Sequence, residues 1–245
     1  MGETVKLSLI IAILDSHEIV RRYMLYLRNL NLPDNIEIIF VDDGSYPALR
    51  ADDSLKNFKL LFTNDMRKWT QGLARMKGVE ESSGEYLFFT DIDHIISEEA
   101  FYAGLEFQGD KMIFQRRFAY LDQDGKLIRD RDKVIEWGLN PKAIRDEYLG
   151  DGVHGNTYII RRSIFEELGG YNRKRCNSGT HLQGEDREFN GRYSKGVRAG
   201  KYKPHKSGPP IYFFPMGKYH IADDENPHGL FHTLYKERWS DWKPT

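Results

Sequence analysis

Two aspartates, Asp91 and Asp93, stand one residue apart at the end of the apolar run "YLFFTDIDHIIS", with His94 beside them. Two negative charges at the end of a buried run are costly unless another group compensates them. Carboxylate pairs suit Mg²⁺ or Mn²⁺, which take oxygen ligands and keep positions open for phosphate oxygens. The pair therefore predicts a divalent-metal site that also holds a diphosphate.

Other interpretations of this stretch are open. Acids favour turns, so Asp93 or Ser97 could simply cap the next helix. A calcium loop is excluded, because its sixth and twelfth positions, counted from Asp91, are Ile96 and Tyr102 instead of Gly and Glu. An aspartate-nucleophile phosphatase, with Asp91 as nucleophile and Asp93 as acid, remains an alternative, although that strand usually opens such chains. No glycine-rich phosphate loop follows the first apolar run, which argues against dinucleotide or P-loop chemistry.

The first part of the chain alternates apolar runs with helical patterns, and this predicts βαβ units and a mainly parallel sheet. The strand candidates are residues 5–14, 36–41, 59–64 and 85–90; the helical patterns are 15–30, where Asp15 or Ser16 can cap the start, and 70–81. Ligands bind beyond the carboxyl ends of such strands. Three of these ends carry acids: Asp15, Asp42 with Asp43, and Asp91 with Asp93. Together they predict one ligand site at this edge of the sheet.

After residue 97 the pattern is less regular. Residues 111–130 indicate a hairpin with a turn at Asp124 and Gly125. Residues 156–172 indicate a strand and a short helix, opened by a capping box from Ser163 to Glu166 and closed by two glycines. A mobile loop over 172–186, a helix from Asp186 and a strand at 211–214 are expected next. Because no linker divides the chain, we expect one domain over 1–245.

Composition excludes some partners. Among 245 residues, 36 Lys and Arg nearly cancel 37 Asp and Glu, so the net charge of -1 indicates no stable nucleic-acid binding. The first apolar run is too short to span a bilayer. A single cysteine, Cys176, precludes an internal disulfide and favours a reducing, cytoplasmic location. The basic stretch 192–206 is expected to be a solvated loop, with an anionic acceptor or peripheral membrane contact as the alternative.

The ordered segments "SLIIAILDSHEIV", "IEIIFVDDGS", "GLARMKGVEESSGEYLFFTDID", "GGYN" and "GED" resemble the nucleotide-sugar glycosyltransferases of the GT-A fold, the large inverting family-2-like group. The segments "QGEDREFNGRYSKG" and "KYHIADDENP" also resemble the end of animal β-1,4-galactosyltransferases. The resemblance implies an α/β GT-A fold: a Rossmann-like, mainly parallel sheet flanked by helices, with a smaller irregular half. It further implies a nucleotide-sugar-binding half over 1–97 and an acceptor-binding half over 98–245.

The resemblance also implies roles for particular residues. Asp186 matches the general base that deprotonates the acceptor hydroxyl, and Glu185 would hydrogen-bond that acceptor. The implied metal ligands for Mn²⁺ or Mg²⁺ are Asp91, Asp93 and His220, with His228 and His232 as reserve choices. The implied donor-binding set is Ala12, Asp15, Asp42, Asp43, Arg75, Asp91 and Ile92. The sequence departs from the family at the first strand, where "AILD" replaces the frequent "PxYN".

These observations predict a metal-dependent, inverting glycosyltransferase that moves a sugar from a nucleotide-diphosphate donor, a UDP-sugar, to a hydroxyl of a glycan or glycoconjugate. Metal and base must flank the sugar, and Asp91 and Asp186 come from separate parts of the chain. Besides the phosphatase, the alternative is a non-catalytic module that binds nucleotide sugars or glycans. Trp137 is a candidate for stacking on an acceptor sugar, and Cys176 is expected to have no role.

Overall fold

The computed structural model describes residues 4–51, 54–65, 67, 70–136, 150–176 and 184–213, with only the backbone at 150–152. Within these residues, nine strands form one mostly parallel sheet in the order β3-β2-β1-β4-β9-β6-β11-β5, with β10 paired to β6. The strands are β1 Leu7–Ile13, β2 Ile36–Asp42, β3 Phe58–Phe62, β4 Tyr86–Asp91, β5 His94–Ile95, β6 Lys111–Phe118, β9 Gly150–Arg161, β10 Lys206–Ser207 and β11 Ile211–Phe213. A two-stranded hairpin, β7 Tyr120–Leu121 and β8 Leu127–Ile128, lies beside this sheet.

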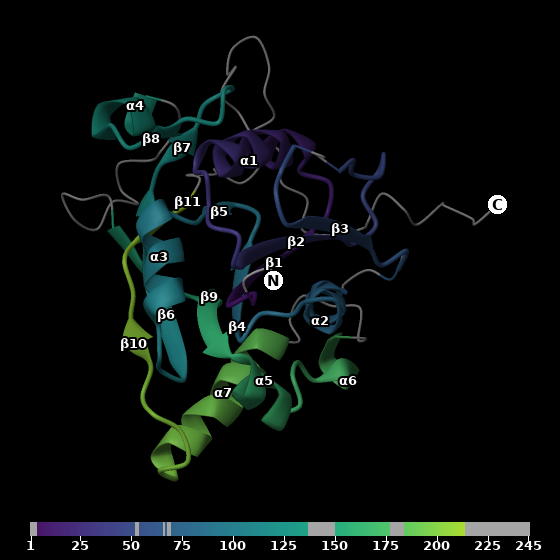
Figure 1. The fold of residues 1–245 in the computed structure, drawn as a ribbon, viewed down its shortest axis with the longest axis vertical. Helices are drawn as coiled ribbons and strands as arrows, with labels where there is room; N and C mark the ends of the chain where they lie inside the picture. The colour runs from purple at the N-terminus through teal and green to yellow at the C-terminus, as the bar shows by residue number, and fades with distance from the viewer. Residues whose placement is uncertain are drawn as a thin grey trace.

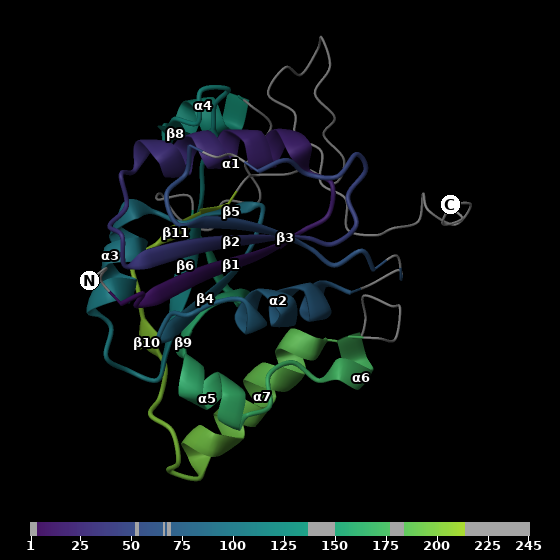
Figure 2. The same cartoon turned by 45° about the vertical axis from the view of Figure 1, so that its right-hand side comes forward.

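Helices cover both faces of the sheet (Figures 1 and 2). They are α1 His17–Asn29, α2 Gln71–Glu80, α3 Glu98–Glu106, α4 Arg131–Glu136, α5 Arg162–Glu167, α6 Arg173–Cys176 and α7 Glu185–Arg198. Figure 2 shows α1 and α4 on one side of the strands, and α2, α5, α6 and α7 on the other. Among the described residues, no helix has the length and hydropathy needed to cross a bilayer.

The first four strands of the chain have the predicted parallel arrangement, in the spatial order β3-β2-β1-β4. Every residue of β1 is buried, because Leu9 and Ile11 face the apolar cluster under α1, while Ile10 and Ala12 face the cluster under α2. A strand covered on both faces shows a continuous apolar run, which is why the sequence reveals it. The chain order reverses between β2 and β4, on either side of β1, and such switch points are where ligands bind.

The boundary at residue 97 does not coincide with a break in the sheet. β9 lies between β4 and β6 and is antiparallel to both, so strands from either side of residue 97 form one continuous hydrogen-bonded sheet. β11 continues the sheet next to β6 and is antiparallel to the short strand β5. This last pairing places His94 opposite Phe213.

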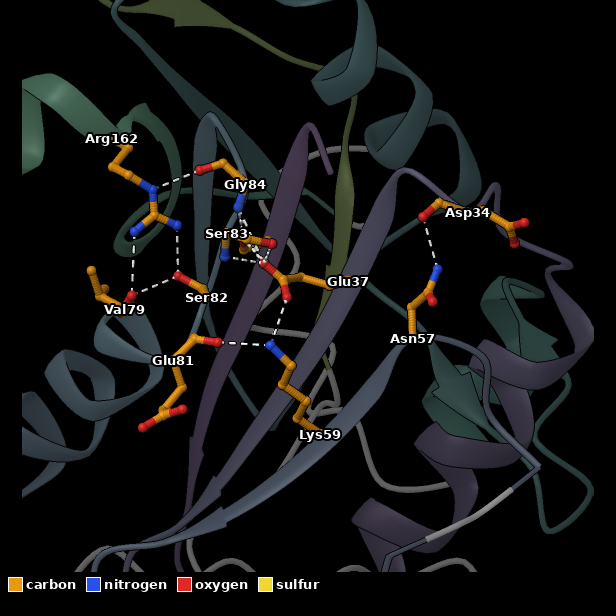
Figure 3. Close-up of polar contacts among 11 residues, drawn as sticks. Asp34, Glu37, Asn57, Lys59, Val79, Glu81, Ser82, Ser83, Gly84 and Arg162 are labelled. Atoms are coloured by element: carbon orange, nitrogen blue, oxygen red, sulfur yellow. Dashed lines mark hydrogen bonds and ion pairs between the residues drawn. The ribbon is translucent and has the colours of Figure 1, made fainter. Parts of the chain in front are cut away.

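The amino ends of the parallel strands are joined by a polar network around Glu37 (Figure 3). The buried Glu37 carboxylate accepts hydrogen bonds from the hydroxyls of Ser8 and Ser83, from the backbone N–H groups of Ser83 and Gly84, and from the ammonium of Lys59. Burial alone would raise the pKa of Glu37, but these donors lower it below the ordinary value. Glu37 thus ties together segments from β1, β2, β3 and the approach to β4.

A buried lysine connects β6 to α7. The ammonium of Lys111 donates to the amide oxygen of Asn190 and lies 4.2 Å from the ring centre of Tyr158 and 5.1 Å from that of Tyr193. The amide nitrogen of Asn190 donates to the carbonyl of Gly155 in β9, at 3.1 Å. Burial lowers the pKa of Lys111 to about 7, because the charged form loses its hydration.

Two helix starts differ from the predicted caps. Ser16 occupies the position before α1, but its backbone is left-handed with φ 52°, and its hydroxyl donates to the carbonyl of Leu14 instead of capping the helix. The predicted capping box at Ser163 is wrong, because the N-cap of α5 is Arg161, two residues before Ser163, and its side chain makes no cap hydrogen bond. Ser97 does cap α3, since its hydroxyl accepts from the N–H of Ala100 at 3.1 Å.

Some other local predictions are confirmed. Gly169 and Gly170 close α5 with φ of 76° and 62°, values that suit glycine. The turn through Asp124 and Gly125 joins β7 to β8, whereas β6 belongs to the main sheet. The predicted loop 172–186 is wrong at its start, because the short helix α6 occupies Arg173–Cys176; residues 177–183 lie outside the described residues.

Candidate active site

The acid-bearing strand ends lie side by side. β1 is in register with both neighbours, so that Ala12 pairs with Val41 of β2 and with Asp91 of β4. Asp42 and Asp91 are the last residues of their strands, and Asp15 follows β1 after one further residue. The sequence prediction that these acids meet at one edge of the sheet is therefore realised in the fold.

Asp42 organises the turn after β2. Its Oδ1 accepts from the backbone N–H groups of Gly44 (3.1 Å) and Ser45 (2.7 Å), and its Oδ2 accepts from the N–H of Leu49 (2.8 Å). Gly44 has φ 93°, which a side chain would oppose. Asp42 as a whole residue is 1% exposed. Its hydrogen bonds give Asp42 a structural function in this turn.

Asp43 and Asp15 lie on either side of that turn. The carboxylate of Asp43 accepts from the hydroxyl of Thr63 (2.9 Å) and from that of Thr70 (2.7 Å), the residue just before α2. The carboxylate of Asp15 accepts from the N–H of Tyr46 (2.9 Å). Asp43 is thus held by hydroxyl groups, which exchange partners more readily than the backbone donors around Asp42 do.

Asp91 lies at the centre of the edge. One of its oxygens, Oδ1, accepts from Gln71 (3.0 Å) and from the guanidinium of Arg75, both in α2. The other, Oδ2, accepts from the amide of Asn156 in β9 (3.2 Å). Burial would raise the pKa of Asp91, but the positive charge of Arg75 outweighs it and holds the pKa well below its usual range. Asp91 therefore stays ionised at neutral pH.

Two histidines lie beside Asp91. His154 Nδ1, in β9, is 3.8 Å from Asp91 Oδ2, and the ring of His94 lies 5.0 Å from that of His154. The Nδ1 atom of His94 is hydrogen-bonded to the hydroxyl of Thr157 at 2.7 Å. Burial lowers the pKa of His94 to about 4, so the ring is neutral at physiological pH. One potential metal-binding atom from each of Asp91, His94 and His154 lies within 4.8 Å of the others.

Arg75 has unused hydrogen-bonding capacity. Its guanidinium is fully buried and lies 5.9 Å from the ring centre of Tyr171. Only one of its nitrogens reaches Asp91, and Nε and Nη1 have no hydrogen-bond partner within the part of the chain that the structure describes. Buried donors without partners are uncommon in proteins, and here they mark a position where an anionic group would be favourable.

The GED segment places α7 against the same edge. Gly184, with φ 55°, precedes α7, and Glu185 is buried against Gly72 in the first turn of α2. A side chain at Gly72 would lie 3.0 Å from Glu185 Cγ and 2.5 Å from Cys176 Sγ, so glycine permits this contact. A methyl group at Gly155 would lie 4.0 Å from Asp186 Oδ2. Asp186 is thus next to the strand segment that carries His154 and Asn156.

A family model for glycosyl transferase family 2 matches residues 8–169, which include β1, β2, β4 and the Asp91 edge. The chain belongs to glycosyl transferase family 2. EpsH of Bacillus subtilis (strain 168), which is named as a glycosyltransferase, is 30% identical over 174 residues, or 67% of this chain. The chain spans about half of that relative, 49% of its length.

Solved structures give the fold of this family 2 chain independent support. S. aureus TarS 1-349 in complex with UDP-GlcNAc aligns with a TM-score of 0.55 at 16% identity, over 89% of this chain and 61% of that one. The mannosyltransferase PcManGT from Pyrobaculum calidifontis, in complex with GDP-Man and Mn²⁺, aligns with a TM-score of 0.50 at 13% identity, over 86% and 57%. The GT-A fold predicted from the sequence is confirmed.

The structure brings most of the predicted site residues of this family 2 chain to one edge of the sheet. Ala12 and Ile92 are there with buried side chains, 6% and 1% exposed. Asp93 is partly exposed and is not a member of the Asp91, His94 and His154 group. The predicted His220, its reserves His228 and His232, and Trp137 lie outside the described residues. Cys176 is buried, and burial raises the pKa of its thiol to about 12, as expected of an unreactive cysteine.

Sequence reasoning missed Gln71, His154 and Asn156. Gln71 stands in the predicted helix without a motif of its own. His154 and Asn156 belong to "GDGVHGN", the start of β9, where glycines and polar residues hide the strand pattern. The only signal for them was their place just before the apolar run "TYII", which is the recognisable part of β9.

Proposed function

We propose that this chain transfers a sugar from a nucleotide-diphosphate donor, most favourably a UDP-sugar, to an acceptor hydroxyl with inversion at the anomeric carbon. The observation that carries the proposal is the meeting of Asp91 and Arg75 with the amino-terminal turn of α7 at a single edge of the sheet. Family membership and the fold of neighbours that bind UDP-GlcNAc or GDP-Man support a nucleotide-sugar donor.

Deprotonation of the acceptor and departure of the diphosphate each have a group suited to them. Asp186 takes the proton from the acceptor hydroxyl, while Glu185, one residue earlier in the chain, orients the acceptor by a hydrogen bond. A divalent cation at the strand ends supplies positive charge to the leaving diphosphate. The family resemblance implies Asp91, Asp93 and His220 as the ligands of that cation. The spare donors of Arg75 complement the negative charge of the donor's phosphates.

Of the two aspartates after β2, we assign Asp43 to the nucleoside. The three backbone N–H groups on Asp42 would have to be given up before it could bind a ligand. Asp43 is held by threonine hydroxyls, which can rotate to new acceptors. An acidic group at this position would accept a hydrogen bond from the ribose hydroxyl or from the N–H of uracil.

The test is release of nucleoside diphosphate from a panel of UDP-sugars and GDP-mannose, with calorimetric titration of UDP and GDP in parallel. We expect UDP to bind and at least one UDP-sugar to be turned over. Proton NMR of the freshly released sugar should show the anomer opposite to that of the donor. Retention of the donor's configuration would contradict inversion, and preference for GDP would contradict the UDP assignment. Cleavage of simple phosphomonoesters would favour a phosphatase, and binding without turnover a non-catalytic module.

A further inference from the structure

Three side chains from separate strands converge at the proposed donor edge with the chemistry of a cation site. Asp91 ends β4, His94 begins β5 and His154 is in β9, and one potential ligand atom of each lies within 4.8 Å of the others. His154 is about one-third exposed, with a side-chain exposure of 34%, whereas His94 is buried. An ion could therefore reach the group from the side of His154.

The surrounding contacts hold these side chains in a fixed orientation. The Thr157 hydroxyl lies 2.7 Å from His94 Nδ1. In the tautomer in which Nδ1–H donates to this hydroxyl, the unprotonated Nε2 is the nitrogen free to bind a metal. A second hydroxyl, that of Thr90, is 3.1 Å from the Thr157 hydroxyl and extends this chain of contacts. Gln71 and Arg75 occupy Oδ1 of Asp91. Outer hydrogen bonds of this kind are typical of metal sites, where they fix the ring and carboxylate positions.

An unpaired acceptor beside Asp91 provides a second, independent observation. The amide nitrogen of Asn156 donates to Asp91 Oδ2, which fixes the direction of the amide. Its oxygen, Oδ1, is then left buried and has no hydrogen-bond partner among the described residues. Buried acceptors of this kind are rare in proteins. A bound cation, or a water molecule on that cation, would supply the missing partner.

The types of ligand determine the class of ion. Mg²⁺ is bound through oxygen atoms and loses its water reluctantly, whereas imidazole nitrogens suit first-row transition metals. We infer that Asp91, His94 and His154 bind a divalent transition-metal ion in preference to Mg²⁺. Such a site of two imidazoles and one carboxylate leaves coordination positions open. The inference rests on the proposed function only in placing the donor's diphosphate at those open positions.

This assignment differs from the set of Asp91, Asp93 and His220 that the family resemblance implies, because it gives Asp93 no direct bond to the ion. It can be examined without any nucleotide. We would titrate Co²⁺ into the metal-stripped full chain, following the visible absorption of bound Co²⁺ and the heat of binding. Competition with about a hundredfold excess of Mg²⁺ would then measure the preference between the two ions.

The expected result is one bound Co²⁺ per chain that Mg²⁺ does not displace. His154→Ala and His94→Ala should each weaken Co²⁺ binding at least about tenfold, since each removes one ligand. Asp93→Asn and the exposed control His205→Ala should bind Co²⁺ like the parent chain. Because His94 is buried, thermal unfolding of each variant shows whether it is folded, and the more exposed His154 gives the decisive comparison.

Retention of full Co²⁺ affinity in folded His154→Ala would overturn the inference, as would displacement of Co²⁺ by an equal concentration of Mg²⁺. Loss of binding in Asp93→Asn alone would return the ion to the paired aspartates. The inference and the proposed function can fail separately. Histidine-dependent Co²⁺ binding without turnover of any nucleotide sugar would contradict only the function, whereas Mg²⁺-supported turnover that ignores both histidines would contradict only the inference.

Discussion

Each end of the parallel strands holds a mostly buried acidic side chain. Glu37 lies at the amino end and Asp91 at the carboxyl end. Both have a lowered pKa because surrounding donors outweigh the effect of burial. Around Glu37, five hydrogen bonds from strands and turns converge on one carboxylate (Figure 3).

At the other end, the partners of Asp91 keep hydrogen-bonding capacity that the described residues do not use. Arg75 has two such nitrogens and Asn156 one such oxygen. A network that is complete stabilises the fold, whereas one with unused donors and acceptors is prepared for a ligand. The comparison therefore assigns stability to the amino end and chemistry to the carboxyl end of the same strands.

Among the variants that test this comparison, Asp186→Asn is expected to have the largest effect, a loss of turnover. Asparagine keeps the shape of the side chain but cannot accept the acceptor's proton, so turnover of the donor should fall by roughly 10² to 10⁴. UDP affinity, measured by calorimetry, should stay unchanged. The matched control is Glu188→Gln in the same helix, which only loses its pair with Arg192 and should retain turnover. Full turnover in Asp186→Asn would place the base elsewhere.

At the amino end, Glu37→Ala should lower the free energy of unfolding by about 3 kcal/mol, because buried N–H groups and the Lys59 ammonium lose their acceptor. Urea unfolding measures this loss, and UDP affinity of the folded variant should be unaffected. The folded-state pKa of Glu37 lies below its ordinary value of 4.5. Its stabilisation is therefore complete above that pH and declines as the pH falls through the folded pKa. If Glu37→Ala had normal stability but bound UDP weakly, the amino end would serve ligand binding and the comparison would be wrong.

Lys111→Met removes a buried charge. In the part of the chain that the structure describes, the Lys111 ammonium contacts Asn190, Tyr158 and Tyr193 and no carboxylate. The folded-state pKa of about 7 lies below the ordinary value of 10.5, so the unfolded chain binds more protons between these values. Wild-type stability should thus gain a contribution of roughly 1–3 kcal/mol as the pH rises through this window, and Lys111→Met should lack it. Urea unfolding at several pH values, with the exposed Lys195→Met as control, measures the difference. Parallel pH profiles for wild type and Lys111→Met would contradict the assignment.

The smallest effect is expected from Lys59→Met at the edge of the Glu37 network. The Lys59 ammonium is 3.2 Å from Glu37, but its side chain is 45% exposed, and such pairs contribute at most about 1 kcal/mol. A small loss in urea unfolding, reduced further by salt, is the expected result. A loss as large as that of Glu37→Ala would mean that the ammonium, and not the backbone N–H groups, dominates this network.

The parallel half of the fold could be predicted from the sequence because its strands are buried on both faces. Continuous runs such as 36–41 therefore stand out, and the acids that follow them mark the functional edge. The first half of β9, before the predicted strand start at Asn156, could not be found, since "GDGVHG" has no apolar alternation and is specified by pairing with distant strands. His154 lies in this part of β9 and Asn156 directly follows it, so their approach to Asp91 depends on long-range contacts.

The wrong predictions of helix N-caps have a different cause. Ser16 and Ser163 have the right residue types for capping, but tertiary contacts decide where each helix begins. The distinction between Asp42 and Asp43 was equally hidden, because it depends on which backbone donors reach each carboxylate after the turn has formed. The residue type identified the acids, and only the folded turn separates their roles.

The central position of β9 has a consequence for protein engineering. A fragment that stops at residue 97 would retain β4 but lose its antiparallel partner, leaving a row of backbone donors and acceptors along Tyr86–Phe89 exposed. Flat apolar edges of this kind invite pairing with other copies and aggregation. Exchange of acceptor-side segments between related enzymes should therefore carry β9 together with β4, because the crossover at residue 97 cuts through a sheet and not between two independent units.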